Sequence, residues 1–423
     1  MNVTVYPGRL SGEVRAPASK SAAHRALIAA ALADGLTTVH IDALNDDIEA
    51  TIDCLSALGA LIDYNPRGGQ LIVRPIEGAP GLRRTLAGLG GKAASHVDYS
   101  DTLELDCGES GSTLRFLLPV ACALGARARL VGRGRLPRRP NRALADALRE
   151  HGARVDSDAL PMEIVGGLTG GLWALPGDVS SQYITGLLFA LPLLGRDSAI
   201  RLTTPLQSAS YVDMTLETLR DFGIDIRPAE RGWIVPGNQA YRTPEDVFVE
   251  GDWSAAAFWL AANAMGSRID VTGVSRRSAQ GDKAVEDLLG RPEIDAANVP
   301  DLVPALAAAA ATLPRRTVIT GAARLRLKES DRLKAVADML NTLGGRAEIT
   351  PDGLIVEGGA PLHGGRVAGM NDHRIVMAAA ILATRADGPV TVTDAQAVSK
   401  SYPGFFDHFQ ALGGKIDVES AGR

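Results

Sequence analysis

The amino-acid sequence predicts an α/β protein built from six βαβαββ units, and three observations support this. Six almost wholly apolar, helix-length runs recur along the chain, each beginning with small polar or charged residues. A short segment rich in β-branched residues follows each run, as expected for a strand. The length of 423 residues exceeds what one hydrophobic core normally serves and suggests two or three domains.

The apolar runs are the expected central helices. Because a helix that is apolar all round must be buried on every side, each needs other layers wrapped over it. The runs are Ser21–Gly35, Ser112–Gly125, Ser181–Gly195, Ser254–Gly266, Asp301–Pro314 and Asp372–Gly388. The strand-like segments after them are Thr37–Ile41, Ala128–Val131, Ala199–Leu202, Arg268–Val271, Thr317–Thr320 and Val390–Val392. The polar residues at the helix starts are expected to face one place.

An amphipathic helix alternates with each apolar run and stops at a glycine, which suits a left-handed C-terminal cap. These glycines are Gly59, Gly152, Gly223, Gly290, Gly344 and Gly413. The residues after Gly290 are too few for a full strand pair. The fourth unit is therefore predicted to be truncated.

Composition excludes several classes of protein. The formal net charge of −5 and the pI near 5.9 argue against a general nucleic-acid binder. The apolar runs are too short and too interrupted to span a bilayer, and no signal peptide is visible at the start. Cys54, Cys107 and Cys122 lack CxxC spacing and are expected to be buried, reduced thiols. A cytoplasmic protein is the resulting expectation.

Cations collect at the unit boundaries rather than on the amphipathic helices, which indicates a cationic pocket for a small anionic ligand. They are Lys20, Arg25, Arg115, Arg139, Lys328, Arg332, Arg374 and Lys400. Lys20 and Arg25 open the first buried helix, where free backbone N–H groups favour an anion. The alternative is that Ser21 is a plain N-cap and that Arg25 lies on a solvated face.

Two further helix starts carry candidate ligand groups. Gly111 lies in a Gly-Ser loop that opens the second buried helix, although such a loop alone is often only a turn. Ser180, Ser181 and Gln182 open the third and supply neutral donors for phosphate or hydroxyl oxygens.

The C-terminal half adds a carboxylate and more cations. Asp301 heads an Ala-rich helix, either as a cap or as a base that takes a proton from a substrate hydroxyl. Strand alternation predicts that Arg324, Arg326 and Lys328 share one face before a helix begins around Glu329. His373 alone is more often a structural histidine than an acid or base.

Nine motifs between residues 17 and 405 together resemble those of the 5-enolpyruvylshikimate-3-phosphate synthase family. They are SKSAAHRAL, GESGSTLRFL, DVSSQ, SYVDMTL, VEGDWSAAAF, PDLVP, LKESDRL, NDHR and SKSYPGF. The resemblance implies an inverse α/β barrel fold with two similar domains of three units each, and an active site in the cleft between them. The implied domains are residues 1–19 plus 252–423, and residues 20–251.

The resemblance also implies an enzyme, a 3-phosphoshikimate 1-carboxyvinyltransferase of aromatic amino-acid biosynthesis. Such enzymes transfer the enolpyruvyl group of phosphoenolpyruvate to the 5-hydroxyl of shikimate-3-phosphate by addition and elimination, and they release phosphate. No cofactor and no metal are implied, and a monomer without nucleic-acid or membrane partners is expected. Asp301 would be the base for the hydroxyl, with Glu329 and Lys20 as the proton-handling pair.

Binding residues follow from the same resemblance. The phosphoenolpyruvate site would comprise Lys20, Gly111, Arg139, Gln182, Arg332, Arg374 and Lys400. Shikimate-3-phosphate would be held by Lys20, Ser21, Arg25, Ser180, Ser181, Gln182, Tyr211, Asp301 and Lys328. The chain departs from the family pattern at Glu109, Phe116 and Arg324. The stretch Gly81–Asp101 is longer than usual and is expected to be a mobile surface loop.

Two alternatives stay open. The related UDP-N-acetylglucosamine enolpyruvyl transferases share the fold and the donor substrate, but they usually have Asn after the first lysine and a reactive loop cysteine. Here Ser21 follows Lys20, and no cysteine lies in such a loop. A non-catalytic anion-binding protein is the second alternative, and it would need neither Asp301 nor Glu329.

Overall fold

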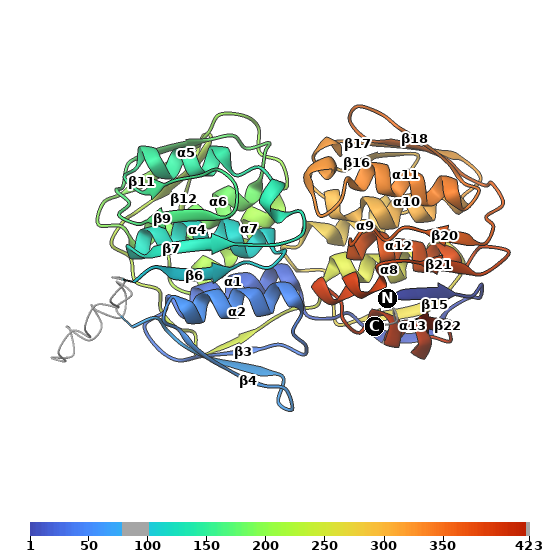
Figure 1. Ribbon diagram of the computed structural model, residues 1–423, viewed down its shortest axis with the longest axis horizontal. Coiled ribbons are helices and arrows are strands. Elements are labelled where there is room, and N and C mark those ends of the chain that lie inside the picture. The colour runs from blue at the N-terminus through green and yellow to red at the C-terminus, as the bar shows by residue number, and fades with distance from the viewer. Residues whose placement is uncertain (78–100, 420–423) are drawn as a thin grey trace. The chain divides into compact units, whose positions relative to one another are not determined.

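The computed structural model describes residues 1–77 and 101–419 (Figure 1). All of the expected surface loop except Asp101 lies outside these residues. The chain divides into two compact units: unit 1 comprises Met1–Pro17 and Glu250–Arg423, and unit 2 comprises Ala18–Val249. The expected boundaries were at residues 19/20 and 251/252. Each unit is an α/β assembly of small sheets around helices, so the predicted fold class is confirmed.

Within its described residues, unit 2 contains three central and three outer helices. The central helices are α1 (Lys20–Ala31), α4 (Gly111–Leu124) and α6 (Ser181–Ala190), and the outer ones are α2 (Asp46–Ala57), α5 (Arg142–Glu150) and α7 (Ala209–Asp221). The strands are β3 (Thr37–His40), β4 (Leu61–Asn65), β5 (Gln70–Arg74), β6 (Leu103–Asp106), β7 (Arg127–Val131), β8 (Arg154–Val155), β9 (Met162–Val165), β10 (Leu172–Leu175), β11 (Ser198–Leu202), β12 (Arg227–Ala229), β13 (Gly232–Val235) and β14 (Asp246–Phe248). Two 3-10 turns are η1 (Leu136–Arg138) and η2 (Leu191–Leu193).

Unit 1 repeats this plan. Its central helices are α8 (Trp253–Ala264), α10 (Val303–Thr312) and α12 (His373–Ala383), which pack on one another, and its outer helices are α9 (Val285–Leu288), α11 (Arg332–Thr342) and α13 (Phe405–Ala411). The strands are β1 (Asn2–Val5), β2 (Ser11–Arg15), β15 (Arg268–Thr272), β16 (Glu293–Asp295), β17 (Arg316–Thr320), β18 (Arg346–Ile349), β19 (Leu354–Glu357), β20 (Gly365–Val367), β21 (Val390–Val392) and β22 (Ile416–Glu419). The 3-10 turns are η3 (Gly281–Ala284), η4 (Pro300–Leu302), η5 (Ala323–Leu327) and η6 (Ala395–Lys400).

The sheets share one pattern, in which a parallel strand pair is extended by two antiparallel strands. The orders in unit 2 are β14-β3-β5-β4, β6-β7-β9-β8 and β10-β11-β13-β12. Unit 1 has β16-β17-β19-β18, β20-β21-β1-β22 and the two-stranded β15-β2. The two-stranded sheet belongs to the fourth repeat, the one that the sequence predicts to be truncated. Strands β1, β2 and β14 each pair with elements far along the chain.

The six glycines at the ends of the amphipathic helices take the left-handed conformation that the sequence predicts. Their φ angles run from 73° at Gly223 to 107° at Gly59. A side chain would be strained there, so each glycine lets the chain turn from the helix end toward the next strand.

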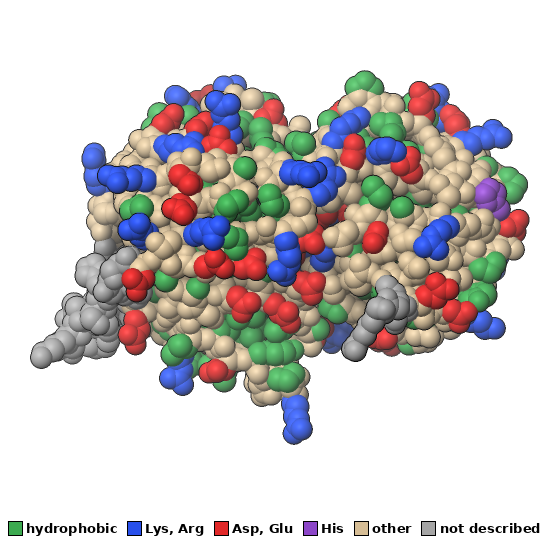
Figure 2. Space-filling model, in the orientation of Figure 1, with side chains coloured by type: hydrophobic (Ala, Val, Ile, Leu, Met, Phe, Trp, Pro, Cys, Tyr) green, Lys and Arg blue, Asp and Glu red, His purple; other side chains and the backbone are tan. Residues whose placement is uncertain are grey.

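Charged side chains of both signs are interspersed on the visible face of each unit (Figure 2). Within the described residues, no helix is both long and apolar enough to cross a membrane. The three cysteines are buried and form no disulfide, as expected, and burial raises the pKa of Cys122 to about 12.

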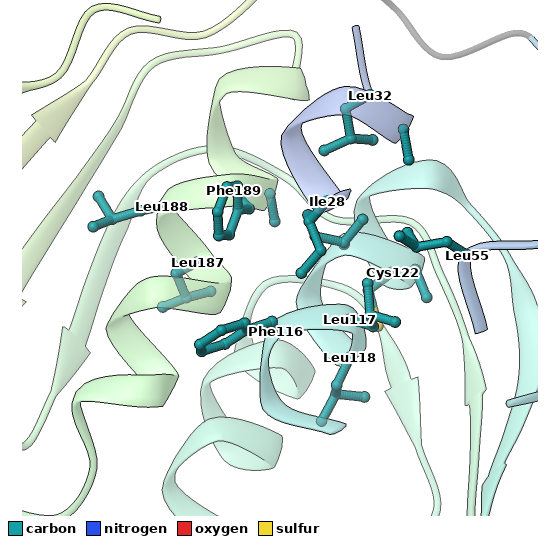
Figure 3. Close-up of a cluster of buried hydrophobic side chains, with 14 of the residues drawn as sticks. Ile28, Leu32, Leu55, Phe116, Leu117, Leu118, Cys122, Leu187, Leu188 and Phe189 are labelled. Carbon is teal, nitrogen blue, oxygen red and sulfur yellow. The ribbon is translucent and has the colours of Figure 1, made fainter. Parts of the chain in front are cut away.

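The cores explain why the central helices read as apolar all round. In unit 2, Ile28 of α1, Leu117 of α4 and Phe189 of α6 meet in one cluster (Figure 3). Phe116 lies in the same cluster, with its ring centroid 6.3 Å from that of Phe189. Helices enclosed in this way are exposed to ligands mainly at their ends, so their first residues can form a site.

Candidate active site

The central helices of the two units begin with different capping groups. In unit 2 the caps of α1, α4 and α6 are the neutral hydroxyls of Ser19, Ser110 and Ser180. In unit 1, α8 and α12 are capped by the carboxylates of Asp252 and Asp372. A carboxylate cap opposes the positive end of the helix dipole, whereas a serine cap does not. The helix starts of unit 2 therefore favour an anion without help from side-chain charge.

Lys20 is the first residue of α1 and is held by a carboxylate from α2. Its Nζ lies 2.8 Å from Oδ2 of Asp47, with 14% and 11% of the two side chains exposed. Asp47 was not singled out from the sequence because an acidic residue in the first turn of a helix needs no further explanation. The pair keeps the ammonium group at the helix start.

Arg25 is buried and joins α1 to α7. Its Nε donates to Oγ1 of Thr215 at 2.9 Å, and its Nη1 and Nη2 donate to the carbonyl oxygens of Ser21 and Tyr211 at 2.6 and 2.7 Å. Its Cζ lies 5.1 Å from the centroid of the Phe116 ring. Burial lowers the pKa of Arg25 to about 10, so the guanidinium stays charged at neutral pH. The structure thus brings three predicted residues, Ser21, Arg25 and Tyr211, together.

The alternative interpretation of this motif, a plain Ser21 cap with a solvated Arg25, is wrong on two counts. The N-cap of α1 is Ser19, whose hydroxyl accepts from the backbone N–H of Ala22 at 3.4 Å, and not Ser21. Arg25 is 2% exposed, so it does not lie on a solvated face.

Gly111 is the first residue of α4 and lies against the Arg139 side chain. A Cβ at Gly111 would be 2.5 Å from Nη1 and 2.8 Å from Cζ of Arg139, closer than real contacts allow. Only glycine lets the guanidinium rest on this helix start. Arg139 itself is 7% exposed.

Gln182 is held by Arg115, one of the predicted boundary cations but not one of the predicted binding residues. Nη1 of Arg115 donates to Oε1 of Gln182 at 2.7 Å, and Nε2 of Gln182 donates to Oγ of Ser112 at 3.0 Å. Arg115 also donates to Oδ1 of Asn141 at 3.1 Å and is 3% exposed. Ser181, which precedes Gln182 in the chain, is buried as the first residue of α6. The buried arginine therefore orients the amide that the α6 start presents.

In unit 1 the centre of the charged cluster is Asp301, in η4 at the start of α10. Oδ1 accepts from Nη1 of Arg332 at 2.8 Å and lies 3.7 Å from Nζ of Lys328. Oδ2 accepts from Nη2 of Arg374 at 3.1 Å. Burial alone would raise the pKa of Asp301, but the charges of Arg374, Lys328 and Arg332 outweigh it and hold that pKa well below its usual range. Leu302, not Asp301, is the residue before α10, so Asp301 is not the N-cap of that helix.

Arg332 collects three carboxylates. Besides Asp301 it contacts Oδ2 of Asp372 through Nε at 2.8 Å and Oε2 of Glu329 through Nη2 at 2.7 Å. Only 1% of the Arg332 side chain is exposed, and none of Asp372. Burial would lower the pKa of Arg332, but the three carboxylates raise it. Asp372, which the sequence motif contains but the site prediction omits, also accepts from the hydroxyl of Ser330 at 2.9 Å.

Arg374 and Lys400 complete the cluster. Nη1 of Arg374 donates to the carbonyl oxygen of Asp301 at 3.2 Å, and Nζ of Lys400 donates to that of Asn371 at 2.7 Å. Four cations, Lys328, Arg332, Arg374 and Lys400, stand against the carboxylates of Asp301, Glu329 and Asp372, which leaves a formal excess of one positive charge. Carboxylates hold Lys328, Arg332 and Arg374 in place, and a backbone carbonyl oxygen holds Lys400, so an incoming anion finds a preorganised set of donors.

One prediction for this region is wrong. Residues 323–327 form the 3-10 turn η5, not a strand, so Arg324, Arg326 and Lys328 do not share a strand face. Arg324 donates to the carbonyl oxygen of Ala297 at 3.0 Å, and Arg326 donates to those of Thr350 and Pro351 at 2.9 and 3.1 Å. Alternation could not reveal this because a turn and a short strand carry similar patterns of apolar residues.

Within the described ranges, no group of three or more His, Cys, Asp or Glu side chains is arranged to hold a metal ion. The chemistry that these residues offer is anion binding by fixed guanidinium and ammonium groups, with an ionised carboxylate at Asp301 beside them. That combination suits proton transfer next to a phosphorylated or carboxylated substrate.

Comparisons with known proteins identify one family. The family model described as EPSP synthase (3-phosphoshikimate 1-carboxyvinyltransferase) matches residues 5–292 and 290–409. A 3-phosphoshikimate 1-carboxyvinyltransferase of Clostridium kluyveri is 39% identical, with 100% of this chain and 99% of that protein covered. One of Clostridium botulinum is 40% identical, covering 97% of each. The EPSP synthase structure from Acinetobacter baumannii matches with a TM-score of 0.79 at 26% identity and covers 99% of this chain and 100% of that one.

Proposed function

The chain belongs to the EPSP synthase family, and we propose that it transfers the carboxyvinyl group of phosphoenolpyruvate to the 5-hydroxyl of shikimate-3-phosphate. The observation that carries the proposal is the ionised Asp301 carboxylate enclosed by Arg332, Arg374 and Lys328. It combines a proton acceptor with donors for an anionic substrate in one place.

In this mechanism the hydroxyl oxygen attacks C2 of phosphoenolpyruvate while C3 gains a proton, which forms a tetrahedral adduct. Asp301 accepts the hydroxyl proton, and Glu329 and Lys20 handle the proton at C3. The adduct then loses that C3 proton and expels phosphate, which leaves the enol ether. Guanidinium groups stabilise the charge on the leaving phosphate.

The site residues are divided between the two substrates. Arg332, Arg374 and Lys400 of unit 1, with Lys20, Gly111, Arg139 and Gln182 of unit 2, are proposed for phosphoenolpyruvate. The residues proposed for shikimate-3-phosphate are Lys20, Ser21, Arg25, Ser180, Ser181, Gln182, Tyr211, Asp301 and Lys328. The serine-capped helix starts support this because they favour a phosphate group.

A phosphate-release assay separates this function from its alternatives. We expect release with phosphoenolpyruvate and shikimate-3-phosphate and none with UDP-N-acetylglucosamine as acceptor. Release with UDP-N-acetylglucosamine would identify the other enolpyruvyl transferase activity. Binding of both anions without release would indicate a non-catalytic protein.

Replacing Gly111 with alanine is expected to raise the KM for phosphoenolpyruvate about tenfold, the scale of one lost charge-assisted hydrogen bond. The new Cβ would displace the Arg139 guanidinium, since it would lie 2.5 Å from Nη1. Steady-state kinetics with each substrate varied in turn provide the measurement. Gly195→Ala is the matched control because its Cβ would meet no atom within 4 Å. An unchanged KM in Gly111→Ala would show that Arg139 does not bind this substrate.

Exchanging one arginine from each set tests the partition between substrates. Arg374→Ala is expected to raise the KM for phosphoenolpyruvate far more than that for shikimate-3-phosphate, and Arg25→Ala the reverse. Because Arg25 also joins α1 to α7, thermal denaturation and the variant Arg25→Lys must accompany it. Equal effects of both changes on both constants would overturn the partition.

A further inference from the structure

A carboxyl group outside the assigned residues is buried at the start of α8. Asp282 lies in η3, with 3% of the residue exposed, and its Oδ2 accepts a hydrogen bond from the hydroxyl of Ser254. Its Oδ1 is buried and has no hydrogen-bond partner among the described residues. A buried carboxylate is costly unless its oxygens are paired, so this group is expected to carry a proton.

Gln280 fixes the segment around Asp282 to the start of α8. Oε1 of Gln280 accepts from the backbone N–H of Trp253 at 3.0 Å, and Nε2 donates to the carbonyl oxygen of Gly251 at 2.8 Å. Helix α8 in turn packs against η4 and α12, which carry Asp301 and Arg374. Asp282 is therefore rigidly placed in the layer that borders the charged cluster.

Charged groups on several neighbouring elements surround Asp282. The carboxylates of Asp301 and of the α8 cap Asp252 raise the cost of its ionisation, whereas Arg374 lowers it. Nζ of Lys283 donates to the carbonyl oxygen of Ser278 at 2.6 Å. Glu286 and Asp287 of α9 are exposed, and Glu286 pairs with Arg276 at 2.9 Å. Two of the groups that act on Asp282 are thus the ones proposed to bind substrate, Arg374, and to accept its proton, Asp301.

We propose that Asp282 is a positioning residue for the reaction, which must stay protonated so that Arg374 is shared only between Asp301 and the anionic substrate. An ionised Asp282 would add a second carboxylate to compete for the Arg374 guanidinium and would repel Asp301. This inference rests on the proposed function, because it takes phosphoenolpyruvate as the ligand of Arg374.

The direction of the pH effect follows from the environment of the group. Burial first, and then the Asp301 carboxylate, raise the pKa of Asp282 to about 7, although Arg374 and the Ser254 hydrogen bond lower it. Below that pH the group is neutral and substrate binding is favoured. Above it kcat/KM for phosphoenolpyruvate should fall as Asp282 loses its proton.

The test is the pH profile of kcat/KM for phosphoenolpyruvate in wild type and Asp282→Asn, because asparagine imitates the neutral carboxyl. We expect the wild type to lose activity as the pH rises through about 7 and the variant to lack this decline. At about pH 6 the two should agree within roughly threefold. Asp287→Asn removes an exposed carboxyl nearby and should leave the profile unchanged.

A second variant changes the pKa of Asp282 but keeps its carboxyl group. Ser254→Ala removes a hydrogen bond that favours the ionised form, so the decline should shift to higher pH. A profile that still declines near pH 7 in Asp282→Asn, or a folded Asp282→Asn that is inactive at every pH, would overturn the proposal. So would a wild type without the decline.

Urea denaturation tests the buried charge without any substrate. At about pH 8 the folded wild type must bury an ionised Asp282, so Asp282→Asn should have the higher urea midpoint, and this advantage should shrink toward pH 5. Absence of carboxyvinyl transfer with this urea result intact would refute the proposed function alone. Equal midpoint differences at both pH values would refute the buried charge.

Discussion

Asp301→Asn is expected to lower kcat by a factor on the order of 100 or more while leaving shikimate-3-phosphate binding within a few fold. The amide cannot accept the proton of the substrate hydroxyl. Removing its negative charge also leaves Arg332 and Arg374 with one carboxylate fewer, so the KM for phosphoenolpyruvate should stay or fall. A fall in kcat without a rise in KM marks a group that acts in the transition state.

The low pKa of Asp301 also predicts how kcat depends on pH. A carboxylate stabilised by two guanidinium groups and an ammonium is a weak base in the empty site. An anionic substrate bound to the same cations would neutralise them and raise the pKa of Asp301. The acid limb of kcat should therefore lie at higher pH than the acid limb of kcat/KM, because only kcat reports the occupied site.

Steady-state kinetics and calorimetric measurement of shikimate-3-phosphate binding test whether Asp301 is the base. Asp352→Asn, which changes a carboxyl that accepts from the backbone N–H of Gly321, is the control for a lost charge in unit 1. If Asp301→Asn keeps more than about a tenth of wild-type turnover, Asp301 is a counterion and not the base.

Arg332→Leu should cost about 3–5 kcal/mol of the free energy of unfolding at neutral pH, the scale for removing one partner of a buried ion cluster. The substitution leaves Asp301, Glu329 and Asp372 facing one another without the cation that joins them. The loss should appear in the urea transition of unit 1, because every partner of Arg332 belongs to that unit.

The pH dependence of this loss has a defined sign. The pKa of Asp301 is depressed in the folded state, so its stabilising contribution is present above the usual aspartate pKa and disappears as the pH falls below it. The difference between Arg332→Leu and wild type should accordingly shrink as acid protonates the carboxylates. Arg316→Leu is the control, since its pair with Glu357 at 3.3 Å is exposed and is expected to contribute no more than about 1 kcal/mol. Equal losses for the two variants would mean that the cluster does not stabilise the unit.

Much of the fold could be read from the sequence because its signals are local. The six all-apolar runs became central helices, and the glycines after the amphipathic helices adopted positive φ. The short stretch after Gly290 indicated the truncated fourth unit. What local pattern could not show is which distant strand completes a sheet, as β14 does for β3.

The site was predicted less completely because charge partners lie far apart in sequence. Arg332 and Asp372 are 40 residues apart, and nothing near either one reveals the contact. Arg115 was visible as a cation, but its hold on Gln182 depends on the packing of α4 against α6. Asp282 reads as an ordinary acidic residue before a helix, and only its burial makes it notable.

The pairing of β1 between β21 and β22 bears on the order in which the units can form during synthesis. Unit 2 is one continuous stretch, so all its strands have left the ribosome once residue 249 has emerged. At that time β1 and β2 have been made but their partners have not, and β1 waits until the last strand is translated. A nascent chain stalled before β15 would therefore expose two unpaired strands together with a finished unit, a state prone to aggregation and suited to chaperone binding.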